Sequence, residues 1–503
     1  MKAINFPVKS LMVACVAASL MNPVFANVTA ANKNGRTKPQ VEQNLSQIIV
    51  KYRNDASYNA TTTSVGSGSS VTALQTQRLS TLQSVAQSFG AYFSVKRQIV
   101  TGGWVYHSSV PLKPAQMRAL AAKLAQNDRT VEYAEPDYIR HAQYVPTDPL
   151  YATAQWDMQT SSTQAGGLNL PGAWDLSLGK GIVVAVLDTG YRPHPDILPN
   201  LVPAQNGVAG QYGYNFITDP VIARITVPSG VKSARGYDAL DQGDWVPNDD
   251  TVCPSQAGNA SSWHGTHVAG TIAAAANNTG VIGVAPSAKV LPLRVLGKCG
   301  GADSDIADAV AWAAGLSVSG VPANANKANV INLSLGGTGY CTKTNAAAFQ
   351  MAMANGTTIV IAAGNESIDA KLSSPANCPG VITVASTSIA GGRAGYSNYG
   401  GSVSVAAPGG GFTTAADVIT STLPTGTTVS TDDTTYGTMA GTSQATPHVA
   451  GVAALMLAVK PTLTPAQIKS ILISTARPAP ANCPGCGAGI VDAAAAVKAA
   501  AGS

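Results

Sequence analysis

The feature that most constrains the fold is an alternation, from residue 144 onward, of short apolar runs with segments rich in small residues. Residues 182–187 read IVVAVL, an uninterrupted apolar run of the kind found in strands buried on both faces of a parallel sheet. Similar runs follow at residues 290–295, 330–333, 358–362, 381–384 and 403–406. Helices are predicted at residues 265–276, 303–314, 345–355 and 443–459. This alternation predicts a doubly wound α/β domain with a mainly parallel sheet over residues 144–503.

A different pattern precedes this region. Strands are expected at residues 47–52, 91–99, 103–110 and 130–133, and helices at residues 74–89 and 114–126. The order β-α-β-β-α-β predicts a small ferredoxin-like α+β domain within residues 45–140. Residues 60–71 are predicted to form a loop. Residues 200–262 interrupt the later α/β alternation with an acidic, aromatic stretch.

The N-terminus has the layout of a secretory signal peptide. Lys2 and Lys9 supply positive charge, residues 11–20 are apolar but too short to cross a bilayer, and cleavage is expected after Ala26. Cys15 offers the alternative of a lipidated cysteine that anchors a lipoprotein, although it follows Lys9 too closely for a full apolar run between them. We therefore expect residues 1–26 to be removed and the product to be secreted without a membrane anchor.

Charge is low and unevenly distributed. Only 11% of the residues are charged, which favours a polar but weakly charged extracellular surface. Residues 1–143 carry a net charge of +9 and residues 144–503 a net charge of −4. A basic segment can bind nucleic acid or membranes, but no Lys/Arg cluster with interleaved aromatic residues supports either partner. We interpret the asymmetry as docking of residues 27–143 on the following domain.

Six cysteines remain after removal of the signal peptide, and an even number in a secreted chain suggests disulfides. They fall into sequential pairs, so the expected bridges are Cys253–Cys299, Cys341–Cys378 and Cys483–Cys486. The spacing Cys483-Pro-Gly-Cys486 is also compatible with a redox or metal pair. Because neither a second such pair nor a thioredoxin-like context accompanies it, a local bridge is the favoured interpretation.

Three polar residues stand where an open α/β sheet places its functional groups. Asp188 ends the first strong strand, His264 begins a helix of small residues, and Ser443 precedes an apolar helix. Each has a structural alternative: Asp188 as a turn residue, His264 as a surface or metal-binding histidine, and Ser443 as a helix N-cap. His264 and His267 lack the glutamate of the His-Glu-x-x-His zinc motif, and His267 is expected to be structural.

Taken together, the three residues predict nucleophilic catalysis. Ser443 would attack a carbonyl, His264 would accept and return its proton, and Asp188 would orient the imidazole. The helix that follows Ser443 would direct free N–H groups at the developing oxyanion. The chain order Asp, His, Ser differs from the Ser, Asp, His order of α/β-hydrolases, which excludes an esterase of that kind.

The motifs around these residues resemble the subtilisin-like serine peptidases, or subtilases. The blocks AVLDTG, HGTHVAGTIAA and GTSQATPHVAG begin at residues 185, 264 and 441, and the resemblance extends from about Asp148 to Val491. It is closest to secreted bacterial members made with a propeptide. It implies an endopeptidase that cleaves proteins through an acyl-enzyme on Ser443. His264, where the acid-active sister group has Glu, implies action at neutral or alkaline pH.

The resemblance also assigns an oxyanion donor and substrate-binding residues. Asn365, in the block Ala362-Ala363-Gly364-Asn365, would donate its amide beside the Ser443 backbone N–H. Glu366 would lie at the mouth of the primary pocket, where it favours basic side chains or is simply solvated. We expect broad specificity for large apolar residues, with tolerance of Lys and Arg. The implied substrate-binding residues are Ser334, Leu335 and Gly336 on one edge, Gly300 and Gly301 on the opposite rim, and Ala362, Gly364 and Glu366 at the pocket.

The resemblance implies structural calcium. Side chains and backbone carbonyls would supply the oxygen ligands that Ca²⁺ prefers; they belong to Asp148, Asp196, Asn277, Ala275, Thr279 and Val281. A second acidic stretch either binds another ion or consists of solvated turn residues; it comprises Asp238, Asp241, Asp244, Asp249 and Asp250.

By the same resemblance, residues 27–143 would be a propeptide. This segment would act as chaperone and inhibitor and be removed by self-cleavage between Arg140 and Tyr144. The mature enzyme, residues 144–503, is expected to be a monomer. The main alternative is an inactive relative that only binds proteins. That reading predicts loss of at least one of Asp188, His264, Asn365 or Ser443, and all four are present.

Overall fold

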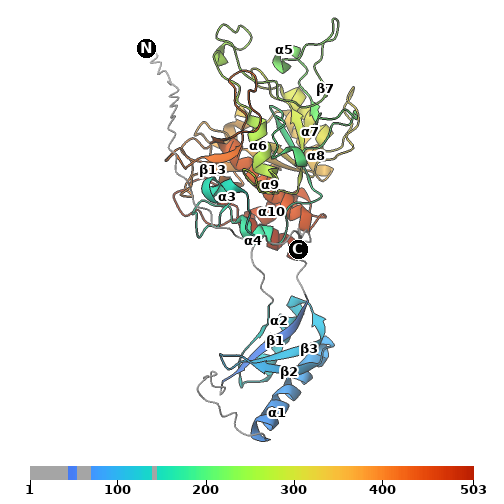
Figure 1. Cartoon of the computed structure of the whole chain (residues 1–503), viewed down its shortest axis with the longest axis vertical. Helices are drawn as coiled ribbons and strands as arrows, with labels where there is room; N and C mark the ends of the chain where they lie inside the picture. Colours follow the sequence, from blue (N-terminus) through green and yellow to red (C-terminus); the bar gives the residue numbers. More distant parts are fainter. Residues whose placement is uncertain (1–43, 54–68, 139–143) are drawn as a thin grey trace, which may run out of the picture. The chain divides into compact units, whose positions relative to one another are not determined.

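The computed structural model describes residues 44–53, 69–138 and 144–503 (Figure 1). The predicted signal peptide at residues 1–26 lies outside the described residues, as does most of the predicted self-cleavage segment, residues 139–143.

The N-terminal unit is a four-stranded antiparallel sheet with two helices. Its strands lie in the order β2-β3-β1-β4, which is the ferredoxin-like arrangement predicted from the sequence. Its core includes Ile48, Val50, Tyr106, Leu120 and Leu124, all fully buried. The elements are β1 (Leu45–Tyr52), α1 (Ser69–Ala86), β2 (Phe93–Gln98), β3 (Trp104–Leu112), α2 (Pro114–Asn127) and β4 (Val131–Pro136). The loop prediction was wrong for residues 69–71, because this first turn of α1 has no apolar spacing that marks a helix.

The α/β domain is built on an eight-stranded sheet in the order β14-β13-β11-β9-β5-β8-β6-β7. All neighbours pair in parallel except β6 and β7. Each apolar run predicted as a strand forms one, so the expected mainly parallel fold is confirmed. The strands are β5 (Val183–Asp188), β6 (Tyr214–Asn215), β7 (Gly236–Tyr237), β8 (Lys289–Arg294), β9 (Val330–Leu333), β11 (Thr358–Ala362), β13 (Ile382–Thr387) and β14 (Val405–Pro408).

Two hydrophobic cores cover the two faces of this sheet. On β5, Val184 and Val186 pack into one core and Ala185 and Leu187 into the other, as the two-residue strand period requires. The first core is closed by α6 (His264–Ala273), α9 (Thr442–Val459), α10 (Pro465–Thr475) and α11 (Ala493–Gly502), and the second by α7 (Asp303–Ala313) and α8 (Lys343–Ala354). Helices therefore lie on both faces, which makes the domain doubly wound (Figure 1).

Shorter elements complete the domain. Residues 200–262 add β6 and β7 to the sheet edge, and Arg235 fastens this insertion to α7 through ion pairs with Asp305 and Asp308 at 2.6 and 2.7 Å. Two small two-stranded sheets lie outside the main one. The remaining α-helices and strands are α3 (Pro149–Ala154), α4 (Leu170–Trp174), α5 (Pro220–Ala223), β10 (Gly337–Thr338), β12 (Ser373–Ser374), β15 (Ile419–Thr422) and β16 (Tyr436–Met439).

Three disulfides connect the six cysteines of the described chain in the expected sequential pairs: Cys253–Cys299, Cys341–Cys378 and Cys483–Cys486. The last is therefore a local bridge, as favoured over a redox or metal pair. The first ties the insertion to the loop after β8. Within the described residues, no helix is both long and apolar enough to cross a bilayer.

Candidate active site

The carboxyl end of β5 meets the start of α6. Asp188, the last residue of β5, is fully buried and contacts the Nδ1 of His264 with both carboxylate oxygens, at 2.8 and 3.0 Å. The first of these oxygens also accepts the backbone N–H of Thr189 at 2.7 Å. Since a carboxylate can only accept, Nδ1 carries the proton and Nε2 is left as the basic nitrogen of the neutral ring.

Close backbone packing sets the position of His264. Gly265 lies so near β5 that a Cβ on it would come within 2.2 Å of the Gly190 carbonyl oxygen. The backbone N–H of Gly265 donates to Thr189 Oγ1 at 3.0 Å, and that hydroxyl donates to the buried carboxylate of Asp241 at 2.6 Å. The glycine that follows the histidine is therefore required by the contact between α6 and β5.

Ser443 lies at the second residue of α9, where backbone N–H groups have no acceptor within the helix. Its hydroxyl donates to the backbone carbonyl of Ser334 at 3.0 Å, and the Ser334 hydroxyl donates to the Ser443 carbonyl at 2.7 Å. These two bonds hold Ser443, the predicted nucleophile, against the end of β9. Hydrogen bonds between catalytic groups often tighten only when substrate is bound.

Asn365 follows β11 and faces the same helix end. Its Oδ1 accepts hydrogen bonds from the backbone N–H and the hydroxyl of Thr442, both at 2.9 Å. The amide is therefore oriented by its oxygen, which leaves Nδ2 as the group available to donate beside Ser443. Thr442 also accepts the backbone N–H of Gly364 at 3.1 Å, so it joins α9 to the loop after β11.

The two histidines of α6 have opposite electrostatic environments. Burial lowers the pKa of His264, but nearby carboxylates more than offset it, so that its pKa lies above the ordinary value of 6.5. Asp188 contributes most, and Asp244 and Asp241 add to it. Burial lowers the pKa of His267 to about 3, and its Nε2 lies 3.0 Å from the Ile419 carbonyl. This neutral, buried ring fits the expected structural role.

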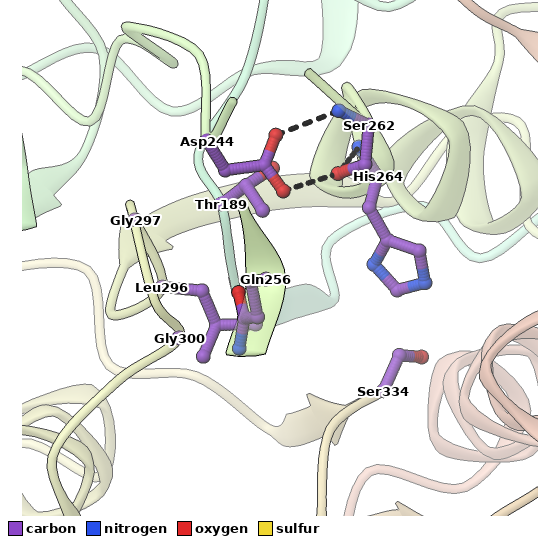
Figure 2. A pocket seen from close by; sticks show the side chains of 9 residues that line it. All are labelled: Thr189, Asp244, Gln256, Ser262, His264, Leu296, Gly297, Gly300 and Ser334. Atoms are coloured by element: carbon purple, nitrogen blue, oxygen red, sulfur yellow. Dashed lines mark hydrogen bonds between the residues drawn. The ribbon is translucent and has the colours of Figure 1, made fainter. Parts of the chain in front are cut away.

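Two adjoining pockets open at the surface beside His264 and Ser334. The first, of about 270 Å³, is lined by His264 and Ser334 and by Thr189, Asp244, Gln256, Ser262, Leu296, Gly297 and Gly300 (Figure 2). The second, of about 570 Å³, lies between residues 299–301 and residues 335–340. Five of the sequence-predicted substrate residues line these pockets: Ser334, Leu335, Gly336, Gly300 and Gly301.

The other three predicted substrate residues lie outside these two linings: Ala362 is the last residue of β11, and Gly364 and Glu366 are in the loop after it. Glu366 folds back over Gly364, and its Oε2 accepts a hydrogen bond of 2.7 Å from the fully buried Asn398. Gly364 has a φ of +102°, and a Cβ there would lie 2.3 Å from Asn398 Nδ2. Glu366 is exposed to solvent, and this hydrogen bond tethers its carboxylate.

The residues predicted to bind calcium converge in one place. The buried Asp148 carboxylate accepts the backbone N–H groups of Asn277 and Asn278, each at 3.1 Å. Asp196, also buried, accepts from Asn277 Nδ2 at 2.8 Å and from the backbone N–H of Val281 at 3.2 Å. Ala275 donates its N–H to the Asp196 carbonyl at 2.8 Å, and Thr279 lies in the same loop.

The electrostatics of this cluster fit a cation. Burial raises the pKa of both Asp148 and Asp196, and the charge of Asp148 raises that of Asp196 further. One buried oxygen of Asp148, Oδ2, has no hydrogen-bond partner. Carboxylate, amide and carbonyl oxygens are the donors that Ca²⁺ prefers, so this set suits that ion.

The suggestion of a second ion site on residues 238–250 is not supported. Asp241 accepts from Thr189 and Gly243, Asp244 from Ser262, and Asp250 pairs with Lys298. Asp238 accepts the Tyr191 hydroxyl at 2.8 Å, and Asp249 is exposed. These carboxylates face separate protein donors. In residues 44–53, 69–138 and 144–503, no three His, Cys, Asp or Glu side chains cluster as a metal site.

Sequence reasoning missed the residues that support the site. Thr442 orients Asn365, and Asn398 orients Glu366. Asp244 holds Ser262, and the Ser262 hydroxyl accepts the backbone N–H of His264 at 3.3 Å. Asp244 lies in the irregular insertion, where no periodicity indicates which side chains meet. Thr442 stands next to Ser443 in the GTSQATPHVAG block, and this adjacency is the one signal that pointed to it.

Comparison with known proteins identifies the family of the chain. Residues 179–493 match the family described as "Subtilase family". The chain is 46% identical over 407 residues to an "Extracellular protease" of Xanthomonas campestris pv. campestris, covering 80% of this chain and 65% of that protein. It is 37% identical over 496 residues to an "Extracellular basic protease" of Dichelobacter nodosus, covering 96% of this chain and 74% of that protein.

Solved structures extend the comparison. A protease from Pseudoalteromonas arctica superimposes with a TM-score of 0.65 at 50% identity, over 71% of this chain and all of that chain. The doubly wound fold and the family match together define a subtilisin-like serine endopeptidase. The chain belongs to the subtilase family, whose members often bind calcium.

Proposed function

We propose that this protein is a secreted subtilisin-like endopeptidase made as a precursor, with Asp188, His264 and Ser443 as its catalytic triad. The observation that carries the proposal is the contact of the buried Asp188 carboxylate with His264 Nδ1. His264 lines one pocket together with Ser334, and the Ser334 carbonyl accepts the hydrogen bond of the Ser443 hydroxyl. Secretion is supported by the signal-like N-terminus and by relatives whose names describe extracellular proteases.

Catalysis would begin with transfer of the Ser443 hydroxyl proton to His264 Nε2 as the oxygen attacks the scissile carbonyl. The Ser443 hydroxyl first exchanges its hydrogen bond to the Ser334 carbonyl for one to the imidazole. His264 then returns the proton to the leaving amine, and an acyl-enzyme on Ser443 remains. Water hydrolyses this ester by the same proton path, and Asp188 stabilises the imidazolium in both halves.

Two donors would stabilise the oxyanion. Asn365 Nδ2 is one, because Thr442 holds the opposite end of the amide. The backbone N–H of Ser443, at the N-terminus of α9, is the other, and the helix dipole adds positive potential there. Such groups are fixed before the reaction and need no rearrangement when charge develops.

The substrate would bind as an extended strand. Ser334, Leu335 and Gly336 continue from β9 and border both pockets, with Gly300 and Gly301 on the opposite rim. Peptide addition to a sheet edge supplies main-chain hydrogen bonds for any sequence, so a broad range of proteins can bind. The side chain before the scissile bond would enter the region of Ala362, Gly364 and Glu366.

Calcium would stabilise the mature domain rather than take part in the reaction. Asp148, Asp196 and Asn277 would supply side-chain oxygens as ligands. The loop residues Ala275, Thr279 and Val281 would supply their backbone carbonyl oxygens. Rotation of the Asn277 amide would turn its oxygen toward Asp196. A bound cation would neutralise two buried carboxylates and fix the loop that follows α6.

The N-terminal α+β unit would serve as propeptide, chaperone and inhibitor. The net charge of +9 on residues 1–143 and −4 on residues 144–503 supports an electrostatic contribution to its docking. A parallel sheet with many long-range pairings folds slowly, which is a physical reason for a folding template. After removal of this unit, the enzyme would act as a monomer.

The test compares the intact masses of the secreted wild type and Ser443→Ala. Self-processing predicts a wild type that begins between residues 141 and 144 and a variant that keeps residues 27–143. Identical shortening of both would mean that another protease matures the chain, and a peptide-hydrolysis assay would then decide activity. If neither is shortened and neither cleaves peptides, the endopeptidase proposal fails.

A further inference from the structure

The pocket beside His264 contains a carboxylate that the triad does not require. Asp244 lines this pocket, and both of its oxygens face Ser262: Oδ1 accepts the backbone N–H at 2.6 Å and Oδ2 the hydroxyl at 2.8 Å (Figure 2). A carboxylate has about four acceptor positions, so these two bonds leave acceptor capacity for a ligand. Asp244 is only half-buried and can therefore be reached.

The neighbouring cations are engaged elsewhere. Arg294 is fully buried and donates to the Thr189 and Ala223 carbonyls, Lys298 pairs with Asp250, and Arg224 lies 3.8 Å over the Trp245 ring. None of these cations lines the pocket, whose other lining side chains, apart from His264, cannot ionise. Asp244 is therefore the carboxylate of the pocket lining, although its charge also interacts with the guanidinium groups of Arg224 and Arg294, which lie outside the lining.

The position of the pocket indicates which substrate residue it receives. Successive side chains of an extended peptide point to opposite sides. If one side chain enters the region of Ala362 and Gly364, the preceding one points toward His264. The second pocket shares Gln256, Leu296 and Gly300 with the first and would receive the side chain two residues further back. This assignment rests on the substrate strand described under the proposed function.

We propose that Asp244 is a specificity-determining residue of this enzyme: it makes the subsite next to His264 select a basic side chain at the second residue before the scissile bond. A Lys or Arg there would lay its aliphatic stem along Leu296 and bring its charge to the free acceptor positions of Asp244. An acidic side chain at that position would be repelled. The preference is distinct from whatever the primary pocket selects.

The experiment uses the mature enzyme and peptides succinyl-Ala-Ala-X-Phe-p-nitroanilide, where X is Lys, norleucine, Ala or Glu. Release of nitroaniline follows cleavage after Phe, so X occupies the proposed subsite. A half-exposed charge pair corresponds to about a fivefold preference. We therefore expect kcat/KM for Lys to exceed that for norleucine by about fivefold, Glu to be the poorest, and high salt to reduce the Lys advantage.

Asp244→Asn keeps the size of the side chain and should bring the Lys/norleucine ratio to about one. Asp249→Asn is the matched control, since Asp249 lies in the same insertion but lines neither pocket, and it should keep the wild-type ratio. A second variant, Gln256→Lys, places a positive charge in the pocket without removing a bond of Asp244 and should favour Glu over Lys. This variant carries the test if Asp244→Asn does not fold.

The outcomes separate the two proposals. The subsite proposal is overturned if the wild type cleaves the Ala peptide but has a Lys/norleucine ratio of kcat/KM near one. It is also overturned if Asp244→Asn keeps the wild-type preference for Lys. An unchanged ratio in Gln256→Lys would also contradict it. If the wild type cleaves none of the peptides, the endopeptidase proposal itself fails.

Discussion

Asn365 Oδ1 accepts two hydrogen bonds from Thr442, one from its backbone N–H and one from its hydroxyl, each at 2.9 Å. The residue before the proposed nucleophile thus orients the proposed oxyanion donor. The loop after β11 and the start of α9 are therefore coupled through one threonine. A change in Thr442 should act on the transition state rather than on substrate binding.

Replacing Asn365 with Leu should lower kcat by ~10²–10³-fold with little change in KM, a magnitude established on a subtilisin itself. Thr442→Val removes one of the two orienting bonds, and we expect a loss of about tenfold in kcat. Steady-state kinetics measure both. Thr446→Val is a matched control, because Thr446 loses a hydroxyl bonded to the Thr442 carbonyl in the same helix. A raised KM with unchanged kcat in Thr442→Val would contradict an orienting role.

The pH profile should follow the charge of His264. The imidazole must be neutral to accept a proton, and the surrounding carboxylates raise its pKa above the ordinary value of 6.5. Activity should therefore fall as the pH drops through a midpoint above 6.5. Asp244→Asn removes one of the charges that favour the imidazolium, so this midpoint should move to lower pH.

The measurement is log kcat/KM against pH with the Ala peptide. Asp249→Asn, which alters an exposed carboxylate of the same insertion, should leave the midpoint in place. A midpoint that moves up in Asp244→Asn, or moves equally in the control, would contradict this electrostatic account. Asp188→Asn cannot serve here, because the new amide would also change the tautomer of His264.

Gly364→Ala should damage both stability and activity. The φ of +102° disfavours any side chain, and the new Cβ would lie 2.3 Å from Asn398 Nδ2 and 2.6 Å from Glu366 Oε2. Backbone strain of this kind costs ~1–3 kcal/mol before the clash is counted. Thermal unfolding should show a Tm lower by several degrees. Gly401→Ala, where nothing lies within 4 Å, should leave the Tm nearly unchanged.

Removal of calcium should destabilise the mature enzyme without blocking chemistry at low temperature. A ligand at 100 times its Kd stabilises a protein by ~2.7 kcal/mol, so EGTA should lower the Tm and shorten the lifetime against self-digestion. Asp196→Asn should have a lower Tm and respond less to added calcium. Equal Tm values with calcium and with EGTA would exclude a stabilising site at Asp148 and Asp196.

The backbone architecture could be predicted because its signals are local. An apolar run such as residues 182–187 identifies a strand buried on both faces, and Asp188 at its end is placed by the rule for open sheets. The charged neighbours could not be predicted in the same way. Asp244 meets Ser262 across an irregular loop, and Asn398 reaches Glu366 across 32 residues, where no period links one side chain to the other.

The acidic stretch illustrates the same limit. Its five aspartates suggested an ion site by composition, but composition does not say which donors surround each carboxylate. In the folded chain, Thr189, Ser262 and Lys298 come from other segments and satisfy Asp241, Asp244 and Asp250 separately. Donors of the protein therefore satisfy these three carboxylates, and the fully buried Asp241 is not the solvated turn residue that the sequence allowed.

The distribution of the site along the chain also has a consequence for timing. Asp188 ends a strand in the middle of the sheet, whereas Ser443 lies in the first turn of a helix that packs on strands formed by residues 330–408. A nascent chain that stops short of residue 443 lacks the proposed nucleophile, and one that stops short of residue 459 lacks part of the helix that holds it. The proposed triad is therefore complete only after synthesis has passed residue 459, so a shorter nascent chain cannot carry out the proposed reaction.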